Sequence, residues 1–286
     1  MSVLDPITHA LAAVVATAHS AATGLGAAPD GVGAWLVALV SVVVTVRLLL
    51  LPLVVRGVKQ AHAAARARPH LAEVQKKFRD AQEKARAKGG AGSRPDPEAL
   101  RELMEERRRI STEHGVSRLG CLPMLLQMPI WIGLYHLIGG AARGRAIGAL
   151  DAGLVASLGA ATLAGVPLAD HGYLGAGTGH LAVVALLAGA AALLSFVTQH
   201  FLVLPNMVLT DAPEAVVSAQ RMMPLLSAGG MLVAASVVPV ALLVYWVVNA
   251  AWTCAQSAVV WRWFPTPGSP AALRHGAPSA SVPGVA

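Results

Sequence analysis

The stretch VTVRLLLLPLVVRGVKQ, residues 44–60, places an arginine inside a long apolar run. The run begins at Ala34 and ends only at Arg56, and Arg47 lies well inside it. About 20 apolar residues are enough to cross the hydrocarbon core of a bilayer as a helix. A charge at the centre of such a helix costs roughly 2.5–3.5 kcal/mol on insertion scales. Arg47 therefore needs polar partners or water within the membrane.

The composition is that of a protein that crosses the membrane several times. Of the 286 residues, 55% are hydrophobic and only 13% are charged, which is too apolar for an ordinary soluble domain of this length. Uncharged apolar runs recur along the whole chain. We therefore predict an all-α polytopic membrane protein with five transmembrane helices, at residues 33–56, 119–140, 181–204, 222–238 and 240–262.

The distribution of basic residues predicts the orientation of these helices. Most of the 22 Lys and Arg residues fall between residues 56 and 118, and the positive-inside rule places such a loop in the cytoplasm. The apolar run after Arg221 is too long for one span, and Pro239 near its middle predicts a turn on the outer side. The N-terminus should then be external and the C-terminus cytoplasmic. The expected markers of the two sides are Gly90 and Ser269 inside, and Ala28 and Gly175 outside.

The segments outside the spans differ in character. Residues 1–32 should form an external segment, either a helix lying at the membrane interface or a loose tail, and no basic leader of a cleavable signal is visible. Residues 141–180 should form an external loop with a short interfacial segment, and residues 205–221 a cytoplasmic loop. The Pro/Ala/Ser-rich residues 263–286 predict a disordered cytoplasmic tail.

Residues 57–118 contain two stretches whose apolar positions recur every three or four residues, which predicts a basic cytoplasmic helical hairpin. The stretch KGGAGSRPDPE separates them, with Asp96 suited to cap the second helix and Pro97 to its first position. The hairpin could be held near anionic lipid headgroups or could dock protein partners. The expected seam consists of Leu71, Val74, Phe78, Ala81 and Ala85 on the first helix and Leu100, Leu103, Arg107 and Ile110 on the second.

Polar side chains on the later spans are candidates to face Arg47. No predicted span contains Asp or Glu, so we interpret Arg47 as lining a hydrated cavity rather than forming a buried ion pair. One stripe on the last span consists of Trp246, Asn249, Thr253 and Gln256, which recur every three or four residues. Further polar residues are Gln127 on the second span and Ser195, Thr198 and Gln199 on the third.

Three segments resemble the YidC/Oxa/Alb membrane protein insertases. They are VRLLLLPLVVRGVKQ, EHGVSRLGCLPMLLQMPIWIGLYHL and VYWVVNAAWTCAQ, and the resemblance runs from about Trp35 to Arg262. It implies five core helices around a hydrophilic groove that opens to the cytoplasm and to lipid, with Arg47 as its membrane arginine. The segment VSRLGCLP departs from the family's usual pattern because no proline precedes its GCLP block. The resemblance implies groove-lining or groove-adjacent positions for Gln127, Gln199 and Trp246. It also matches Asn249 and Gln256 to a family pattern. Thr253, which lies on the same stripe of the last span, completes the predicted groove residues.

The resemblance implies an insertase and chaperone for integral membrane proteins in the bacterial plasma membrane. The implied partners are nascent membrane proteins and the lipid bilayer. The Sec translocon, components of the signal recognition pathway and the ribosome are candidates for the cytoplasmic hairpin, and no nucleic acid is expected. No cofactor, metal or enzymatic activity is expected, since the sequence contains no G-x-S-x-G, H-E-x-x-H or G-x-x-x-x-G-K-[ST] pattern.

Two other classes of function stay open at the level of sequence. A small-solute channel or transporter with an anion-attracting cavity would carry internal repeats or paired broken helices, and no repeat is visible. A structural assembly factor would act through the cytoplasmic hairpin alone. For the insertase, a role of Arg47 as a point charge predicts that Arg47→Lys keeps much of the activity. A role that depends on several directed hydrogen bonds predicts the reverse.

Overall fold

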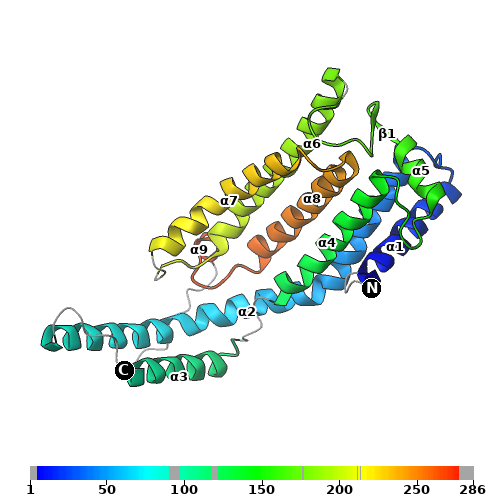
Figure 1. Cartoon of the computed structure of the whole chain (residues 1–286). Coiled ribbons are helices and arrows are strands. Elements are labelled where there is room, and N and C mark those ends of the chain that lie inside the picture. Colours follow the sequence, from blue (N-terminus) through cyan, green and yellow to red (C-terminus); the bar gives the residue numbers. More distant parts are fainter. Residues whose placement is uncertain are drawn as a thin grey trace. The chain divides into compact units, whose positions relative to one another are not determined.

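The computed structural model describes residues 5–89, 97–116, 122–175, 177–210, 212 and 214–276, and they are mostly helical (Figure 1). The chain divides into two compact units. The first comprises Met1–Pro52, Leu122–Leu204 and Ser218–Val259, and the second comprises Leu53–Cys121, Pro205–Val217 and Val260–Ala286. In chain order the elements are α1 (Asp5–Gly24), α2 (Val32–Gly89), α3 (Pro97–Glu113), α4 (Leu122–Ala142), α5 (Ala152–Ala160), β1 (Thr162–Leu163), β2 (Val166–Pro167), α6 (Gly177–Val197), a π-helical turn (Thr198–Val203), a 3-10 turn (Leu204–Asn206), α7 (Glu214–Ala234), α8 (Val240–Trp263) and α9 (Pro270–Arg274).

Three helical segments among the described residues are long and apolar enough to cross a membrane. They are Val32–Glu83, Gly177–Asn206 and Val240–Trp263. The chain is therefore a helical protein with several candidate membrane spans. α7 begins at Glu214, so it takes up the second half of the predicted loop 205–221, and its polar first turns lower its mean hydropathy. The arrangement of five spans around a groove stays a prediction.

The core of the first unit is built around Trp35, which is fully buried near the start of α2. Its indole Nε1 donates a hydrogen bond of 3.0 Å to Oγ of Ser157, which itself donates to the carbonyl of Pro29 at 2.7 Å. His19 on α1 contacts the same carbonyl at 3.0 Å and packs against the Trp35 ring. A large aromatic side chain whose N–H is satisfied joins α1, α2 and α5. Other fully buried core residues are Leu39, Leu134, Leu137, Ile138, Leu150, Leu158, Leu168, Leu242 and Leu243.

The N-terminal segment is a helix rather than a loose tail. α1 has 20 residues and packs along α4 (Figure 1). One face of α1 is buried, and its buried residues recur at the three- and four-residue spacing of an amphipathic helix. The buried residues of α1 are Thr8, Leu11, Ala12, Val15, His19 and Ala22.

The predicted loop 141–180 contains the helix α5 and a small antiparallel hairpin formed by β1 and β2. α5 has nine residues, which is far too short to cross a bilayer. Asp151 interrupts the apolar run in the sequence because it caps this helix, with its Oδ1 accepting a hydrogen bond of 2.9 Å from the backbone N–H of Leu154. In the hairpin, Thr162 pairs with Pro167 and Leu163 with Val166.

The chain after β2 is bonded to the turn between α7 and α8, in which Pro239 lies. The N–H of Val240 donates to the carbonyl of Asp170 at 2.8 Å, and the N–H of Gly172 donates to the carbonyl of Val238 at 3.3 Å. We call this contact, between residues 168–173 and 232–241, the α7–α8 clasp. It fixes the turn after α7 to the rest of the first unit.

Two side chains complete the α7–α8 clasp. The hydroxyl of Tyr173 donates to the carbonyl of Leu232 at 2.7 Å, near the end of α7, where helix carbonyls lack backbone partners. Burial raises the pKa of Tyr173, so the hydroxyl keeps its proton and remains a donor. His180 is buried, with Nε2 2.8 Å from the carbonyl of Gly172 and Nδ1 3.5 Å from Oδ2 of Asp170.

In the second unit, α2 continues without a break to Gly89, and α3 begins at Pro97, the position predicted for the start of the second hairpin helix. Part of the predicted seam is present in a small cluster in which Val74 and Ile110 are buried together with Ala67. Leu71 and Leu103 pack against this cluster, as does Val116. Of the other predicted seam residues, Phe78 is half-buried and Ala81, Leu100 and Arg107 are exposed, while Asp96 and the side chain of Ala85 lie outside the described residues.

The prediction of a disordered tail is wrong for residues 263–276. α8 ends at Trp263, and α9 follows with Ser269 as its cap, whose Oγ accepts a hydrogen bond of 3.2 Å from the N–H of Ala272. The small side chains that suggested disorder instead allow close packing, and Pro270 fits the first turn of a helix. Residues 277–286 lie outside the described residues.

The tail segment depends on one amide side chain, and we predict that Asn206→Ala loosens it. Oδ1 of Asn206 accepts a hydrogen bond of 2.7 Å from the N–H of Thr266, which is a buried residue. An N–H left without a partner at such a site costs about 1–3 kcal/mol. Hydrogen exchange of residues 264–276 should therefore speed up in Asn206→Ala. His62→Ala is the control, because the contact of His62 with the carbonyl of Phe264 is exposed and should matter less.

Candidate functional site

Arg47 on α2 is held by two neutral side chains of α8. Its Nη2 donates hydrogen bonds of 2.8 Å to Oδ1 of Asn249 and 2.6 Å to Oγ1 of Thr253. Its Nε donates a further bond of 3.2 Å to Oδ1 of Asn249. Among the described residues, no ion pair involves Arg47. The guanidinium therefore keeps its full positive charge while its orientation is fixed.

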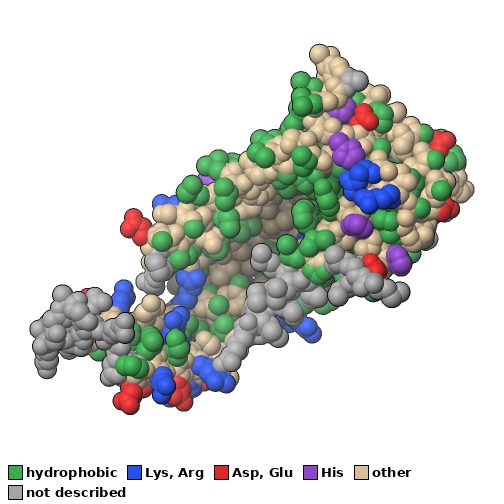
Figure 2. Space-filling view, in the orientation of Figure 1, with side chains coloured by type: hydrophobic (Ala, Val, Ile, Leu, Met, Phe, Trp, Pro, Cys, Tyr) green, Lys and Arg blue, Asp and Glu red, His purple; other side chains and the backbone are tan. Residues whose placement is uncertain are grey.

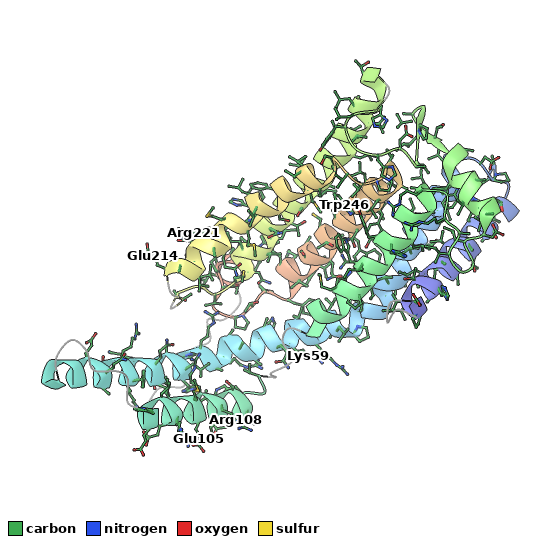
Figure 3. All side chains as sticks on the ribbon, viewed as in Figure 1. Lys59, Glu105, Arg108, Glu214, Arg221 and Trp246 are labelled. Carbon is green, nitrogen blue, oxygen red and sulfur yellow. The ribbon has the colours of Figure 1, made fainter. Side chains whose placement is uncertain are left out.

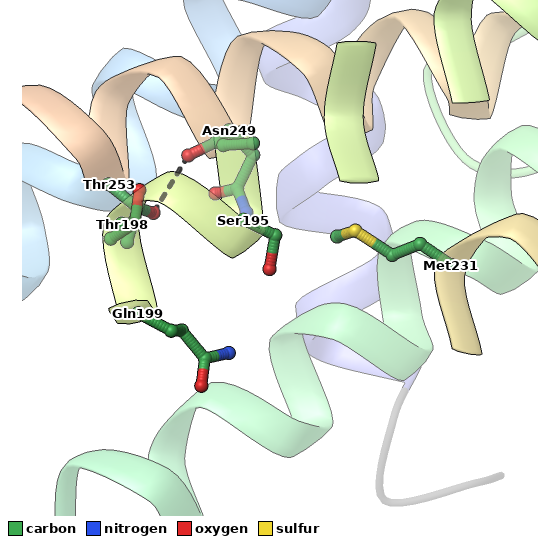
Figure 4. Close-up of a pocket in the computed structure, with 7 residues that line it drawn as sticks. Ser195, Thr198, Gln199, Met231, Asn249 and Thr253 are labelled. Atoms are coloured by element: carbon green, nitrogen blue, oxygen red, sulfur yellow. Dashed lines mark hydrogen bonds between the residues drawn. The ribbon is translucent and has the colours of Figure 1, made fainter. Parts of the chain in front are cut away.

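The two acceptors are themselves ordered by α8. Oγ1 of Thr253 donates to the backbone carbonyl of Asn249 at 2.8 Å, so its lone pairs are left to face Arg47 (Figure 4). Asn249 and Thr253 stand four residues apart and thus share one face of the helix. They are the middle two residues of the stripe expected from the sequence, and here they bring one cation and two neutral acceptors together.

Asn249 and Thr253 also line a cavity of about 190 Å³. The other lining residues are Ser195, Thr198 and Gln199 from the segment of α6 and its π-helical turn, Met231 from α7 and Ala250 from α8. In Figure 4 the side chains of Ser195, Gln199 and Met231 point toward the same space. A cavity of this size has room for several water molecules, and the polar groups among its lining side chains could bind them. Figure 2 shows a hollow between α7 and α4 with α8 behind it.

The π-helical turn positions the polar part of this wall. α6 changes from α-helical to π-helical hydrogen bonding at Thr198, and the turn continues to Val203. A π turn adds a residue to the helix and shifts the direction of the side chains around it, and such turns are frequent at functional sites. The hydroxyl of Thr198 donates to the carbonyl of Leu194 at 2.6 Å. Two consecutive residues of the π-helical turn, Thr198 and Gln199, thus contribute polar side chains to the cavity wall.

The remaining predicted site residues lie elsewhere. Trp246 is 6% exposed and belongs to the hydrophobic core of the first unit (Figure 3). Gln256 accepts a hydrogen bond of 3.3 Å from Nε1 of Trp252, one turn earlier on α8. Gln127 is half-buried on α4. Of the predicted set, Gln199, Asn249 and Thr253 line the cavity, and Arg47 is hydrogen-bonded to the last two of them.

Two residues of α7 were absent from the predicted site. Met231 lines the cavity, and Ser227 forms a hydrogen bond of 2.9 Å with Ser195 on α6. No periodic polar pattern marks α7, so neither residue could be singled out from spacing. The only signal was the serine itself, in the otherwise apolar stretch MMPLLSAGGMLVA.

The fold and the site together define a multi-pass helical membrane protein with an arginine bonded to two polar side chains that line a cavity. The family model described as "60Kd inner membrane protein" matches residues 28–266, which is most of the chain. The chain belongs to this family, the YidC/Oxa/Alb membrane protein insertases.

Several curated relatives carry the name of this activity. The chain is 29% identical over 280 residues to the membrane protein insertase YidC of Streptomyces avermitilis, an alignment that covers 94% of this chain and 61% of the relative. It is 24% identical over 278 residues to the membrane protein insertase YidC of Bifidobacterium longum, covering 94% of this chain and 78% of the relative. It is also 32% identical over 107 residues to the membrane protein insertase YidC 1 of Listeria monocytogenes, covering 37% of this chain and 32% of the relative.

Proposed function

We propose that this chain inserts integral membrane proteins into the bacterial plasma membrane and helps them fold. The observation that carries the proposal is the site of Arg47, a full positive charge hydrogen-bonded to Asn249 and Thr253, whose side chains line a cavity. The names of the relatives and the family match support the same activity.

The cavity lowers the barrier for the polar part of a substrate. A short hydrophilic segment that enters it avoids the full thickness of hydrocarbon, and attraction to Arg47 offsets part of the desolvation of an acidic segment. The apolar helix of the substrate then partitions into lipid, which supplies most of the driving force. The membrane potential favours outward movement of each acidic charge by about 2.3 kcal/mol per 100 mV.

The membrane arrangement is part of the proposal. α2, α4, α6, α7 and α8 would cross the bilayer, with α1, α5 and the β1–β2 hairpin on the external side. The basic helices of the second unit, α3 and the end of α2, would lie in the cytoplasm. Their exposed charged surface suits docking of the ribosome, the Sec translocon or components of the signal recognition pathway.

Reconstitution tests the proposed activity directly. The purified chain in liposomes should protect the translocated segment of a single-span, acidic-tailed substrate from external protease. Liposomes without the chain give the background rate of spontaneous insertion. Insertion no better than this background, by chain that is shown to be folded, would contradict the proposal.

We predict that single-cysteine labelling places the chain near Leu25 and Leu174 outside the cell, and the chain near Glu105 and Leu273 in the cytoplasm. Of the cytoplasmic marker positions expected from the sequence, Ser269 is fully buried and Gly90 lies outside the described residues. Exposed residues are therefore better sites for thiol labelling. Leu25 and Leu174 are 91% and 101% exposed and should be labelled from outside as cysteines. Cysteines at Glu105 and Leu273 should be labelled only after the membrane is opened.

The measurement uses intact cells, a membrane-impermeant thiol reagent and a background in which Cys121 and Cys254 are replaced by serine. Each variant is labelled again after detergent lysis, so that a buried thiol is not mistaken for a cytoplasmic one. Labelling of the Glu105→Cys variant in intact cells would overturn the proposed orientation.

A further inference from the structure

α7 is the most exposed of the helices that contribute to the cavity. Pro224 is its only buried residue among those described, whereas α6 and α8 each bury several side chains. The exposed apolar residues of α7 include Met222, Leu225, Leu226 and Val233. A helix with little buried surface moves at a lower cost than its neighbours. α7 is thus the wall of the cavity that is held least firmly.

Met231 and Ala234 of α7 pack against the apolar core, and among the described residues two side-chain hydrogen bonds join α7 to α6 and to the loop before α6. One is the hydrogen bond of 2.9 Å between the hydroxyls of Ser195 on α6 and Ser227 on α7. The other is the bond from Tyr173 to the carbonyl of Leu232, at the end of α7. Ser195 itself lines the cavity and points into it (Figure 4). The serine pair therefore connects the shape of the cavity to the position of α7.

The sequence of α7 allows it to bend on either side of Ser227. Pro224 lies inside the helix, where it has no N–H for the backbone ladder. Gly229 and Gly230 follow one turn later, and a side chain added at either of them would meet no neighbouring atom within 4 Å. These glycines are not required by close packing. They weaken the helix by roughly 0.5–1 kcal/mol each relative to alanine.

We propose that Ser195 and Ser227 are positioning residues of the groove, whose mutual hydrogen bond sets the separation of α6 and α7 at rest and opens when a polar substrate segment enters. This inference rests on the proposed insertase function. The two hydroxyls then turn to the backbone N–H and C=O groups of the segment. One hydrogen bond is exchanged for others, so the opening costs little.

A reversible cross-link tests the opening. Ser195→Cys and Ser227→Cys, in a background without Cys121 and Cys254, place two sulfur atoms where oxygen atoms now lie 2.9 Å apart, within reach of a disulfide. Oxidation should close the disulfide and reduce insertion of the acidic-tailed substrate to the background of empty liposomes. Dithiothreitol should restore insertion in the same sample. The restored activity excludes misfolding as the cause of the loss.

The single variants Ser195→Cys and Ser227→Cys, treated with the same oxidant, are the matched controls, and each should insert the substrate at the same rate before and after oxidation. Ser227→Ala, which removes the bond, should change the insertion rate by only about threefold, the usual size of an interhelical hydrogen bond in a membrane. Equal insertion by the oxidised and the reduced double-cysteine variant would overturn the proposed role of the two serines. If the wild-type chain inserts the substrate in the same assay, the proposed insertase function stands. A wild-type chain that inserts nothing would overturn both.

Discussion

Replacing Arg47 with alanine should reduce insertion of substrates with acidic translocated segments by about ten- to a hundredfold. The guanidinium makes three hydrogen bonds to neutral acceptors, and a bond from a charged donor is worth about 1.5–3 kcal/mol. Its charge is not cancelled by a carboxylate of the described residues, so it is available to a substrate. Substrates with neutral translocated segments should be affected least.

The Arg47→Lys variant separates charge from geometry. The fork of Nε and Nη2 reaches Oδ1 of Asn249 with two nitrogen atoms, and Nη2 also reaches Thr253. A lysine has one nitrogen and cannot reproduce this arrangement. We therefore expect an intermediate activity for Arg47→Lys, lower than a point charge alone would predict, with the preference for acidic segments retained.

The insertion yield of matched substrates that differ only in tail charge measures both effects, normalised to folded protein. Asn249→Ala is the control, because it keeps the charge of Arg47 and removes two of its three bonds. It should behave like Arg47→Lys rather than Arg47→Ala. If all three variants were equally defective whatever the charge of the substrate, Arg47 would have only a structural role.

The periodicity of α8 was enough to predict part of this site. Asn249 and Thr253 recur at helical spacing, and a lone arginine in an apolar span needs such partners. The same spacing also put Trp246 in the predicted site, although its side chain lies in the core. Spacing shows which residues share a face of a helix, but it does not show what each end of that face contacts. Gln256 bonds within its own helix, which spacing cannot distinguish from a contact across helices.

Features that depend on tertiary packing could not be predicted in this way. Ser227 belongs to the site only because α7 lies beside α6 at this point, and one serine in an apolar stretch has no directional signal. α9 was missed because it has only five residues, too few to be stable alone, and it is ordered by burial of Ala271 and Ala272. The composition of this segment predicted disorder, but burial of its small side chains against the rest of the second unit orders it as a helix.

Gly172→Ala should destabilise the first unit by about 2–4 kcal/mol. Gly172 has φ +66°, which costs a residue with a side chain about 1–2 kcal/mol. A Cβ atom would stand 2.2 Å from the carbonyl oxygen of Ser236, which belongs to backbone and cannot rotate away. The two segments of the α7–α8 clasp must separate, and each lost hydrogen bond adds about 0.5–1.5 kcal/mol.

Gly165→Ala is the matched control for this effect. Gly165 has φ +83° in the turn between β1 and β2, but an added Cβ would meet no atom within 4 Å. It should therefore lose only the conformational part, about 1–2 kcal/mol. Thermal unfolding of the purified variants in detergent compares the two, and hydrogen exchange of residues 236–241 locates the difference. Because the clasp holds the end of α7, exchange there should rise in Gly172→Ala and stay unchanged in Gly165→Ala. Equal losses of stability with no local change in exchange would mean that the close approach of Gly172 to Ser236 does not hold the turn in place.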